Sequence, residues 1–217
     1  MTQSGKETAS HGPKTREGAS ARTMARILSA AMDIANQQGL TGLTIGALAR
    51  SVGMSKSGVF ARFNSKDNLQ LAILELAAKD FSNQVVEPAL RQQKGLARVE
   101  MLFESWVQYL NEDSQQGSLL LRVAREADTF SDEVQAFAQT TQRNLLASLE
   151  RVLKGAKDMG DLAEECDVQL MARQWYWDML GYFHFKFILN DEEAEPYLRK
   201  AFEQMIESLK GRRTRAS

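Results

Sequence analysis

The chain of 217 residues is 43% hydrophobic and 25% charged, a composition that supports a substantial core in a globular protein. No stretch approaches the roughly 18 apolar residues of a membrane span, and residues 1–22 lack the apolar segment of a secretory signal. A single cysteine, Cys166, excludes an internal disulfide and fits a reducing compartment, so we expect a cytoplasmic protein with no membrane partner; redox sensing by Cys166 stays open.

Charge is unevenly distributed along the chain, although the formal net charge is only −1. Residues 1–68 hold nine Lys and Arg residues against four acids, whereas residues 69–217 hold eighteen against twenty-four. A basic N-terminal part followed by an acidic remainder favours a polyanion as the partner of the N-terminal part. Charge alone is explained equally well by simple solvation of a surface.

The N-terminal part predicts a tail followed by four helices. Residues 1–22 are rich in Ser, Thr, Gly, Lys and Glu, and we expect a disordered tail; the alternative is an arm that enters a DNA minor groove with Lys14, Arg16 and Arg22. Apolar residues then recur at helical spacing. The expected helices cover residues 23–38, 45–52, 56–62 and 65–87.

Capping and breaking residues mark the ends of these helices. Gly39 and Gly53 stand where helices end, and Pro88 is expected to stop the fourth helix. The residues expected to cap helix starts are Thr44, Ser55 and Ser65.

The two short helices carry a spacing typical of a helix-turn-helix. Ala49 is small enough for two helices to cross closely, Gly53 permits a tight turn, and Val59 provides an apolar plug that pins the second helix to the first. Such a pair can lay its second helix in the major groove of DNA. The spacing is moderately specific, and the basic surroundings and helix caps strengthen it.

The remainder of the chain stays helical. Segments are expected at 96–110, 119–127, 131–154 with Ser131 as cap, 168–189 and 192–210, with a loop at 154–167 and a frayed basic tail at 211–217. The segment 168–189 is apolar on nearly every side and must be buried on nearly every side. We therefore expect a homodimer in which 168–189 and 192–210 of two subunits form a four-helix interface. Its candidate interface residues are Trp177, Gly181, His184 and Ile188.

Residues 23–76 resemble the DNA-binding domain of the tetracycline repressor (TetR) family of bacterial regulators. The stretches that carry the resemblance are RILSAA at 26–31, GLTI at 42–45, LARSVGMSK at 48–56, FARF at 60–63 and SKDNL at 65–69. Beyond them, only the helical character and the loop MGDL at 159–162 resemble the family. The resemblance implies an all-α fold: a three-helix domain at 23–68 that binds double-stranded DNA, and a helical regulatory and dimerisation domain at 69–210.

The family's roles carry over position by position. Ser55 and Lys56 would open the recognition helix near the phosphates, and Thr44 and Lys66 would contact phosphates from either side. Base readout would fall to four residues, of which Arg62 alone can grip a guanine with two hydrogen bonds; a phosphate contact is as good an explanation for it. The four are Ser57, Gly58, Ala61 and Arg62.

Three positions depart from the family pattern. Phe60 stands where the family commonly has a tyrosine whose hydroxyl meets a phosphate, so that contact should be missing. Ser57 and Gly58 replace a more usual Gly-Thr order, and Gly58 costs the short helix roughly 1 kcal/mol relative to alanine.

The resemblance also implies a repressor that releases a palindromic operator when an unknown small molecule binds within the body and moves the fourth helix. An apolar or aromatic ligand is favoured, and a cation on the aromatic faces is possible; core packing is the competing role of each candidate. Asp178 and Gln174 either orient a ligand or are satisfied across the dimer. The candidate lining residues are Phe103, Trp106, Leu110, Phe137, Thr141, Leu145, Trp175, Met179 and Phe183.

Three other classes of protein fit less well. An enzyme is disfavoured because the chain has no phosphate-binding glycine loop and only His11 and His184, and we expect no cofactor and no metal. A non-specific architectural protein is disfavoured by the acidic, aromatic-rich remainder. A helical interaction module that has lost DNA binding would fit Phe60 and Gly58. The operator, the effector, the regulated genes and the sign of regulation are not encoded in any readable pattern.

Overall fold

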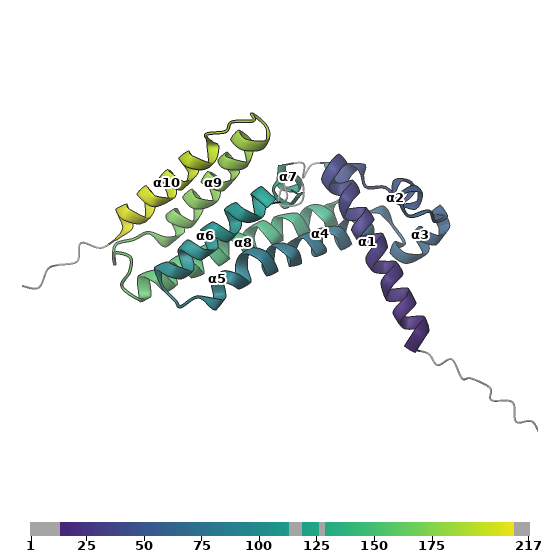
Figure 1. The fold of residues 1–217 in the computed structure, drawn as a ribbon, viewed down its shortest axis with the longest axis horizontal. Coiled ribbons are helices and arrows are strands. Elements are labelled where there is room, and N and C mark those ends of the chain that lie inside the picture. Colours follow the sequence, from purple (N-terminus) through teal and green to yellow (C-terminus); the bar gives the residue numbers. More distant parts are fainter. Residues whose placement is uncertain (1–13, 113–118, 126–128, 211–217) are drawn as a thin grey trace, which may run out of the picture.

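The computed structural model describes residues 14–112, 119–125 and 129–210, and every regular element in these residues is a helix (Figure 1). The expected all-α fold is confirmed. In chain order the elements are α1 (Lys14–Gly42), α2 (Ile45–Val52), α3 (Lys56–Phe63), α4 (Lys66–Phe81), the π-helical turn η1 (Ser82–Val86), α5 (Glu87–Arg91), α6 (Leu96–Glu112), α7 (Leu119–Arg125), α8 (Asp132–Asp158), α9 (Val168–Phe187) and α10 (Ala194–Leu209).

The molecule is elongated, with a small head at one end and a larger helical body (Figure 1). The head consists of α1, α2 and α3, and the body consists of α4 to α10. Ile27, Leu48 and Val59 are fully buried in the head, and they share one core with Leu69 of α4 and Val123 of α7. The core of the head therefore continues past residue 68, and α4 and α7 connect the head to the body.

The first helix is longer than the sequence predicted. Residues 14–22, expected in a disordered tail, belong to α1, while residues 1–13 and 211–217 lie outside the described residues. Extending an existing helix is cheap because its nucleus has already formed, and residues 14–22 contain one glycine and no proline. Gly39 interrupts α1 with φ 75° and ψ 166°, as the sequence predicted. Beyond this break, Gln70 of α4 donates a buried 2.8 Å hydrogen bond to the carbonyl of Leu40.

The fourth helix does not stop before Pro88, contrary to the sequence prediction. It passes through the π-helical turn η1 into α5, which ends at Arg91. Pro88 directly follows η1, where the wide turn already departs from the regular hydrogen-bond pattern that a proline interrupts. The wide turn η1 ends with Glu87, whose N–H bonds to the carbonyl of Ser82 five residues earlier.

The body packs α8 against α4, α6 and α9, and α9 against α10. Helix α8 extends to Asp158, past the expected end near Lys154, and α9 ends at Phe187. Ser131 precedes α8 but does not cap it, contrary to expectation: its buried Oγ has no hydrogen-bond partner among the described residues. In the described part of the chain, no helix has both the length and the hydropathy of a membrane span.

Candidate functional site

The turn between α2 and α3 has the geometry that the Ala49, Gly53 and Val59 spacing predicted. Gly53 ends α2 in the left-handed region with φ 67°, a conformation that glycine adopts without a steric penalty. The N–H of Met54 donates to the carbonyl of Ala49 at 2.9 Å, and Val59 is fully buried. Helix α3 is thereby held at a fixed angle against α2.

All three caps predicted for α2, α3 and α4 are formed. The hydroxyl of Thr44 accepts from the N–H of Ala47 at 3.1 Å, that of Ser55 from Gly58 at 3.0 Å, and that of Ser65 from Asn68 at 2.9 Å. Each cap satisfies a backbone donor that the helix itself leaves without a partner.

The residues assigned to DNA contacts are accessible. Gly58 and Arg62 are half-buried, and the other seven are exposed. Lys56 and Arg62 have no ion-pair partner anywhere in the residues that the structure describes. The exposed seven are Thr44, Ser55, Lys56, Ser57, Phe60, Ala61 and Lys66.

Two unusual residues of α3 have clear surroundings. Phe60 is 52% exposed, so its ring contributes little to the core and faces outward from α3. A Cβ atom at Gly58 would lie 3.1 Å from the capping hydroxyl of Ser55, so the glycine leaves room for that cap. The outward surface of α3 therefore combines an apolar ring with small side chains and two cations.

A cavity of about 460 Å³ lies in the body between α4, η1, α6, α7 and α8. Its size is within the usual range for small-molecule sites. Four of the predicted lining residues surround it, and Phe81, Leu120 and Leu121 complete much of its apolar wall. The four are Trp106, Phe137, Thr141 and Leu145.

The other five predicted lining residues do not reach this cavity. Phe103 stacks on Phe202 of α10 at 3.8 Å between ring centroids, and Trp175 contacts both rings. The rings of Phe103, Trp175 and Phe202 are buried because α9 packs against both α8 and α10 with its apolar face. The five that pack in the body core are Phe103, Leu110, Trp175, Met179 and Phe183.

The sequence analysis missed the polar residues of the cavity. Gln142 and Arg151 both line it. Gln142 donates to the carbonyl of Leu120 at 2.9 Å and accepts from the hydroxyl of Tyr176 at 2.5 Å. The sequence feature that could have identified Arg151 as a lining residue is the helical spacing of Phe137, Thr141 and Leu145, because the same face of α8 continues to Arg151.

The predicted dimer residues lie on the outer face of α9. Trp177 and Ile188 are 57% and 51% exposed, Gly181 is half-buried and His184 is exposed. Tyr197 of α10, 67% exposed, adds to this apolar face. A single subunit thus leaves one side of α9 uncovered, which is unusual for so many large apolar side chains.

Three residues with open roles are now placed. Asp178 lines a groove between α9 and α10 beside Trp177, away from the cavity, and burial raises the pKa of its carboxyl. Gln174 is exposed. Burial also raises the pKa of the Cys166 thiol, which disfavours the thiolate that oxidation requires.

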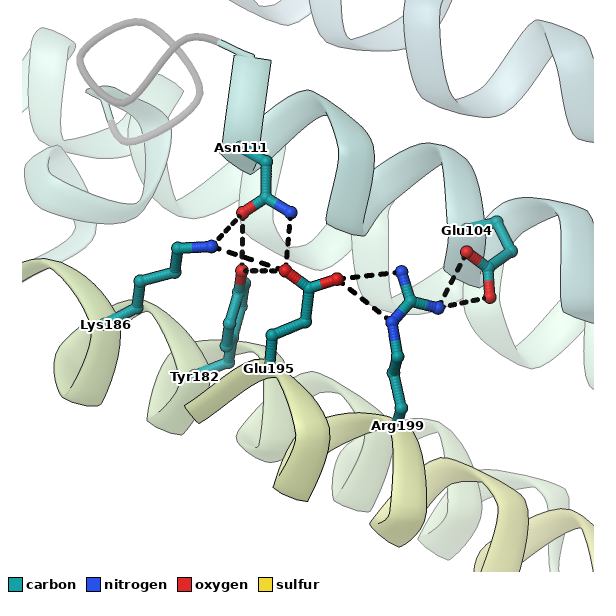
Figure 2. A network of polar contacts seen from close by, with 6 residues as sticks. All are labelled: Glu104, Asn111, Tyr182, Lys186, Glu195 and Arg199. Atoms are coloured by element: carbon teal, nitrogen blue, oxygen red, sulfur yellow. Dashed lines mark hydrogen bonds and ion pairs between the residues drawn. The ribbon is translucent and has the colours of Figure 1, made fainter. Parts of the chain in front are cut away.

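A polar network fixes α9 and α10 against α6 (Figure 2). The carboxylate of Glu195 accepts from Asn111 at 2.8 Å and from Arg199 at 2.9 Å, and Arg199 also donates to Glu104 at 2.7 Å. Burial by itself raises the pKa of Glu195, but hydrogen bonds from Asn111, Arg199 and Lys186 outweigh it and hold the pKa below its ordinary value. The network residues are Glu104, Asn111, Tyr182, Lys186, Glu195 and Arg199.

Replacing Glu195 with glutamine is expected to lower the free energy of unfolding by about 1–2 kcal/mol at neutral pH, because a charged acceptor is lost from the network. Since the folded protein lowers the pKa of Glu195, this stabilisation is complete above the ordinary glutamate pKa of about 4.3 and is lost as pH falls through the lowered value. Urea unfolding at pH 7 and below pH 4 measures the difference.

The exposed Glu203 on the same helix provides the control, since Glu203→Gln should change little at either pH. Equal losses in the two variants, or a loss at Glu195 that persists in acid, would contradict this role for Glu195.

Comparison with known proteins relates both parts of the chain to one family. A family model described as bacterial regulatory proteins, tetR family, matches residues 27–73, and a model of the tetracyclin repressor-like C-terminal domain matches residues 95–202. No curated protein matches the chain.

Solved structures share the fold at low sequence identity. A TetR transcription regulator from Haloarcula marismortui is 18% identical with a TM-score of 0.74, covering 88% of this chain and 99% of that one. SmeT, the repressor of the Stenotrophomonas maltophilia multidrug efflux pump SmeDEF, is 20% identical with a TM-score of 0.67, covering 86% and 90%. AibR, solved in complex with isovaleryl coenzyme A and operator DNA, is 19% identical with a TM-score of 0.63, covering 82% and 97%.

These structures support the fold, and the two family matches fall on the two parts that the structure distinguishes. The N-terminal match covers the α2–α3 turn, and the C-terminal match covers most of the helices that enclose the cavity. The chain therefore belongs to the tetracycline repressor (TetR) family of bacterial DNA-binding transcriptional regulators.

Proposed function

We propose that the protein is a homodimeric repressor that binds a palindromic operator through α3 and releases it when a small apolar or aromatic molecule enters the cavity beside Trp106. Its place of action is the cytoplasm, where bacterial DNA lies. SmeT is a repressor, and AibR was solved with both an acyl compound and operator DNA. We extend that combination of ligand and DNA binding to this chain as part of the proposal.

The observation that carries the proposal is the position of α7. Leu120 and Leu121 line the cavity, whereas Leu119 and Val123 of the same helix are buried in the core of the head. Arg122 donates a 2.8 Å hydrogen bond to the carbonyl of Asn36 in α1. A ligand that displaces α7 would therefore change the position of the head, and α4 offers a second connection of the same kind.

In the head and at the start of α4, we propose that Thr44, Ser55, Lys56 and Lys66 contact phosphates and that residues of α3 read the bases. Exposure of these residues and the unpaired charges on Lys56 and Arg62 support this assignment. Phosphate contacts set affinity and position, while base contacts set sequence preference. The residues proposed for base contacts are Ser57, Gly58, Ala61 and Arg62.

Selection of bound sequences from a random or genomic DNA pool tests the proposal. The wild type should enrich a palindrome, and Lys56→Ala/Arg62→Ala should not. Arg143→Ala/Lys200→Ala removes the same charge from exposed positions of the body and should enrich as the wild type does. A wild type that enriches no sequence would contradict the proposal. If both double variants lose the enrichment equally, the loss would reflect the change in net charge and not a contact at Lys56 or Arg62.

Replacing Phe60 with tyrosine is expected to raise operator affinity about fivefold, because the exposed ring would gain a hydroxyl able to bond a phosphate. The slope of affinity against salt should not change, since no charge is added. Phe60→Leu keeps the position apolar and should give no gain. Unchanged affinity in Phe60→Tyr would place residue 60 away from the DNA backbone.

A further inference from the structure

A second, wider hollow of about 530 Å³ adjoins the cavity beside Trp106. It lies between α5, the start of α6 and the end of α8. Val86, Ser148 and Arg151 line both spaces, so the two spaces meet at these three side chains. A molecule longer than the inner cavity can therefore extend past Arg151 into the wider one.

The wider hollow carries uncompensated positive charge. Its lining includes four bases and one acid, Asp158. The acid forms an ion pair with Lys154 at 2.8 Å, so it neutralises a base of its own. The four bases are Lys94, Arg98, Arg151 and Lys154.

Arg151 stands at the junction with its charge unpaired. Its Nε donates to the carbonyl of Ala147 at 3.3 Å, and its guanidinium donates to the hydroxyl of Ser148 at 3.1 Å. These two contacts orient the guanidinium without neutralising it, and no carboxylate in the described residues pairs with it. Arg98 is likewise held by backbone carbonyls, those of Leu90 and Gln92.

We propose that the effector of this regulator is an amphipathic acid, with an apolar body in the cavity beside Trp106 and one anionic head group at Arg151. This inference rests on the proposed function and names the chemical class of its ligand. An oriented guanidinium at the edge of an apolar cavity is suited to bind a carboxylate, phosphate or sulfonate with two hydrogen bonds. Arg151 is exposed, so solvent screens part of that attraction, and the two hydrogen bonds supply the preference for an anion.

The same arrangement disfavours other ligands. A cation would meet the unpaired charges of Arg151, Arg98 and Lys94, although the aromatic walls alone would accept it. A neutral apolar molecule would fill the inner cavity and leave the basic hollow without a role. An anionic head group is therefore the chemistry that makes use of both spaces.

Two fluorescent probes of nearly identical shape test the proposal. Anilinonaphthalene sulfonate carries an anionic group, and N-phenylnaphthylamine is the same ring system without it; both become fluorescent in an apolar site. The wild type should bind the sulfonate more tightly than the neutral amine. Arg151→Gln should weaken sulfonate binding about tenfold and leave the neutral probe unchanged.

Two further variants locate the bound probe. Leu145→Trp fills the inner cavity and should remove both probes, with thermal unfolding as the check that the variant is folded. Arg143→Gln, on α8 but lining neither space, should bind both probes as the wild type does. Displacement of the sulfonate by decanoate or by octyl phosphate would then identify the preferred head group.

Equal affinity for the two probes, or sulfonate binding that is unaffected by Arg151→Gln, would overturn the proposal. So would binding that survives Leu145→Trp. Operator binding of the wild type, measured separately, tests the proposed function. If the wild type binds the sulfonate through Arg151 but selects no operator, the proposed regulatory function would be wrong. The proposed anion site would still be supported.

Discussion

Replacing Gly181 with leucine is expected to separate the proposed dimer and to lower operator affinity at least about a hundredfold. A Cβ atom at Gly181 has no atom within 4 Å in the subunit, and leucine favours a helix more than glycine does. The subunit should therefore fold normally. In the dimer, the leucine would hold apart two helices that meet at this face of α9, and each half-site would lose its paired contacts.

Sedimentation and operator titration measure the two effects together. Gly155→Leu on α8 is the matched control for sedimentation, because Gly155 is also in a helix with open space around its Cβ position, and that variant should stay dimeric. Operator titration is not compared for it, since Gly155 also lines the wider hollow. A Gly181→Leu protein that sediments as the wild type does would exclude a close approach of subunits at this residue.

Replacing Trp175 with alanine is expected to lower the free energy of unfolding by about 3–5 kcal/mol. Trp175 is 1% exposed and contacts the rings of Phe103 and Phe202. The small side chain would leave a large void between α6, α9 and α10. Urea unfolding followed by circular dichroism measures the loss without depending on the fluorescence of the removed ring.

The result also separates two roles for Trp175, core packing and ligand binding. Trp175→Phe should cost less, because it keeps a ring and removes an indole N–H that has no hydrogen-bond partner in the described residues. Leu170→Ala, at a position 51% exposed on the same helix, should change stability by no more than about 0.5 kcal/mol. Loss of ligand binding with little loss of stability in Trp175→Ala would restore the ligand role that the sequence suggested.

The head was predictable because its signals are local. The hydroxyl before each of α2, α3 and α4, the glycine at the sharp turn and the apolar plug at Val59 act within a few residues of one another, so reading them requires no knowledge of distant contacts. The same holds for Gly39. Which side chains would contact DNA follows from a resemblance and from exposure, and these assignments stay proposals.

The cavity was only partly predictable because it depends on which helices become neighbours. Phe137 and Trp175 are both aromatic, and each lies on the apolar side of a long helix. Only the packing of α8 turns Phe137 toward α4 and α7, while α9 turns Trp175 toward α10. Arg151 escaped attention because a basic residue on a long helix is ordinarily a solvated one.

The π-helical turn at 82–86 changes the angular position of side chains around the axis of the continuous helix formed by α4, η1 and α5. Six residues four apart along this helix are all buried. In an ideal α-helix each such step advances about 40°, so five steps would carry the stripe roughly 200° around the axis. The π-helical turn contains one extra residue, which rotates the following residues back by about 100° around the axis. The same line of side chains can therefore pack into the core of the head at one end and into the core of the body at the other. The six are Leu69, Ile73, Ala77, Phe81, Val85 and Ala89.

The angular phase between head and body is thus set by a single supernumerary residue in η1. Deleting one residue from Ser82–Val86 while restoring an ordinary α-helix would leave that angle unchanged, because the wide turn holds one extra residue. Rewinding the same five residues as an ordinary α-helix, with none removed, would instead turn the head by about 100° relative to the body. In a dimer joined through α9, the two α3 helices would then be oriented differently relative to each other. Their operator half-sites would have to change in spacing or in relative rotation, with no residue of α3 altered.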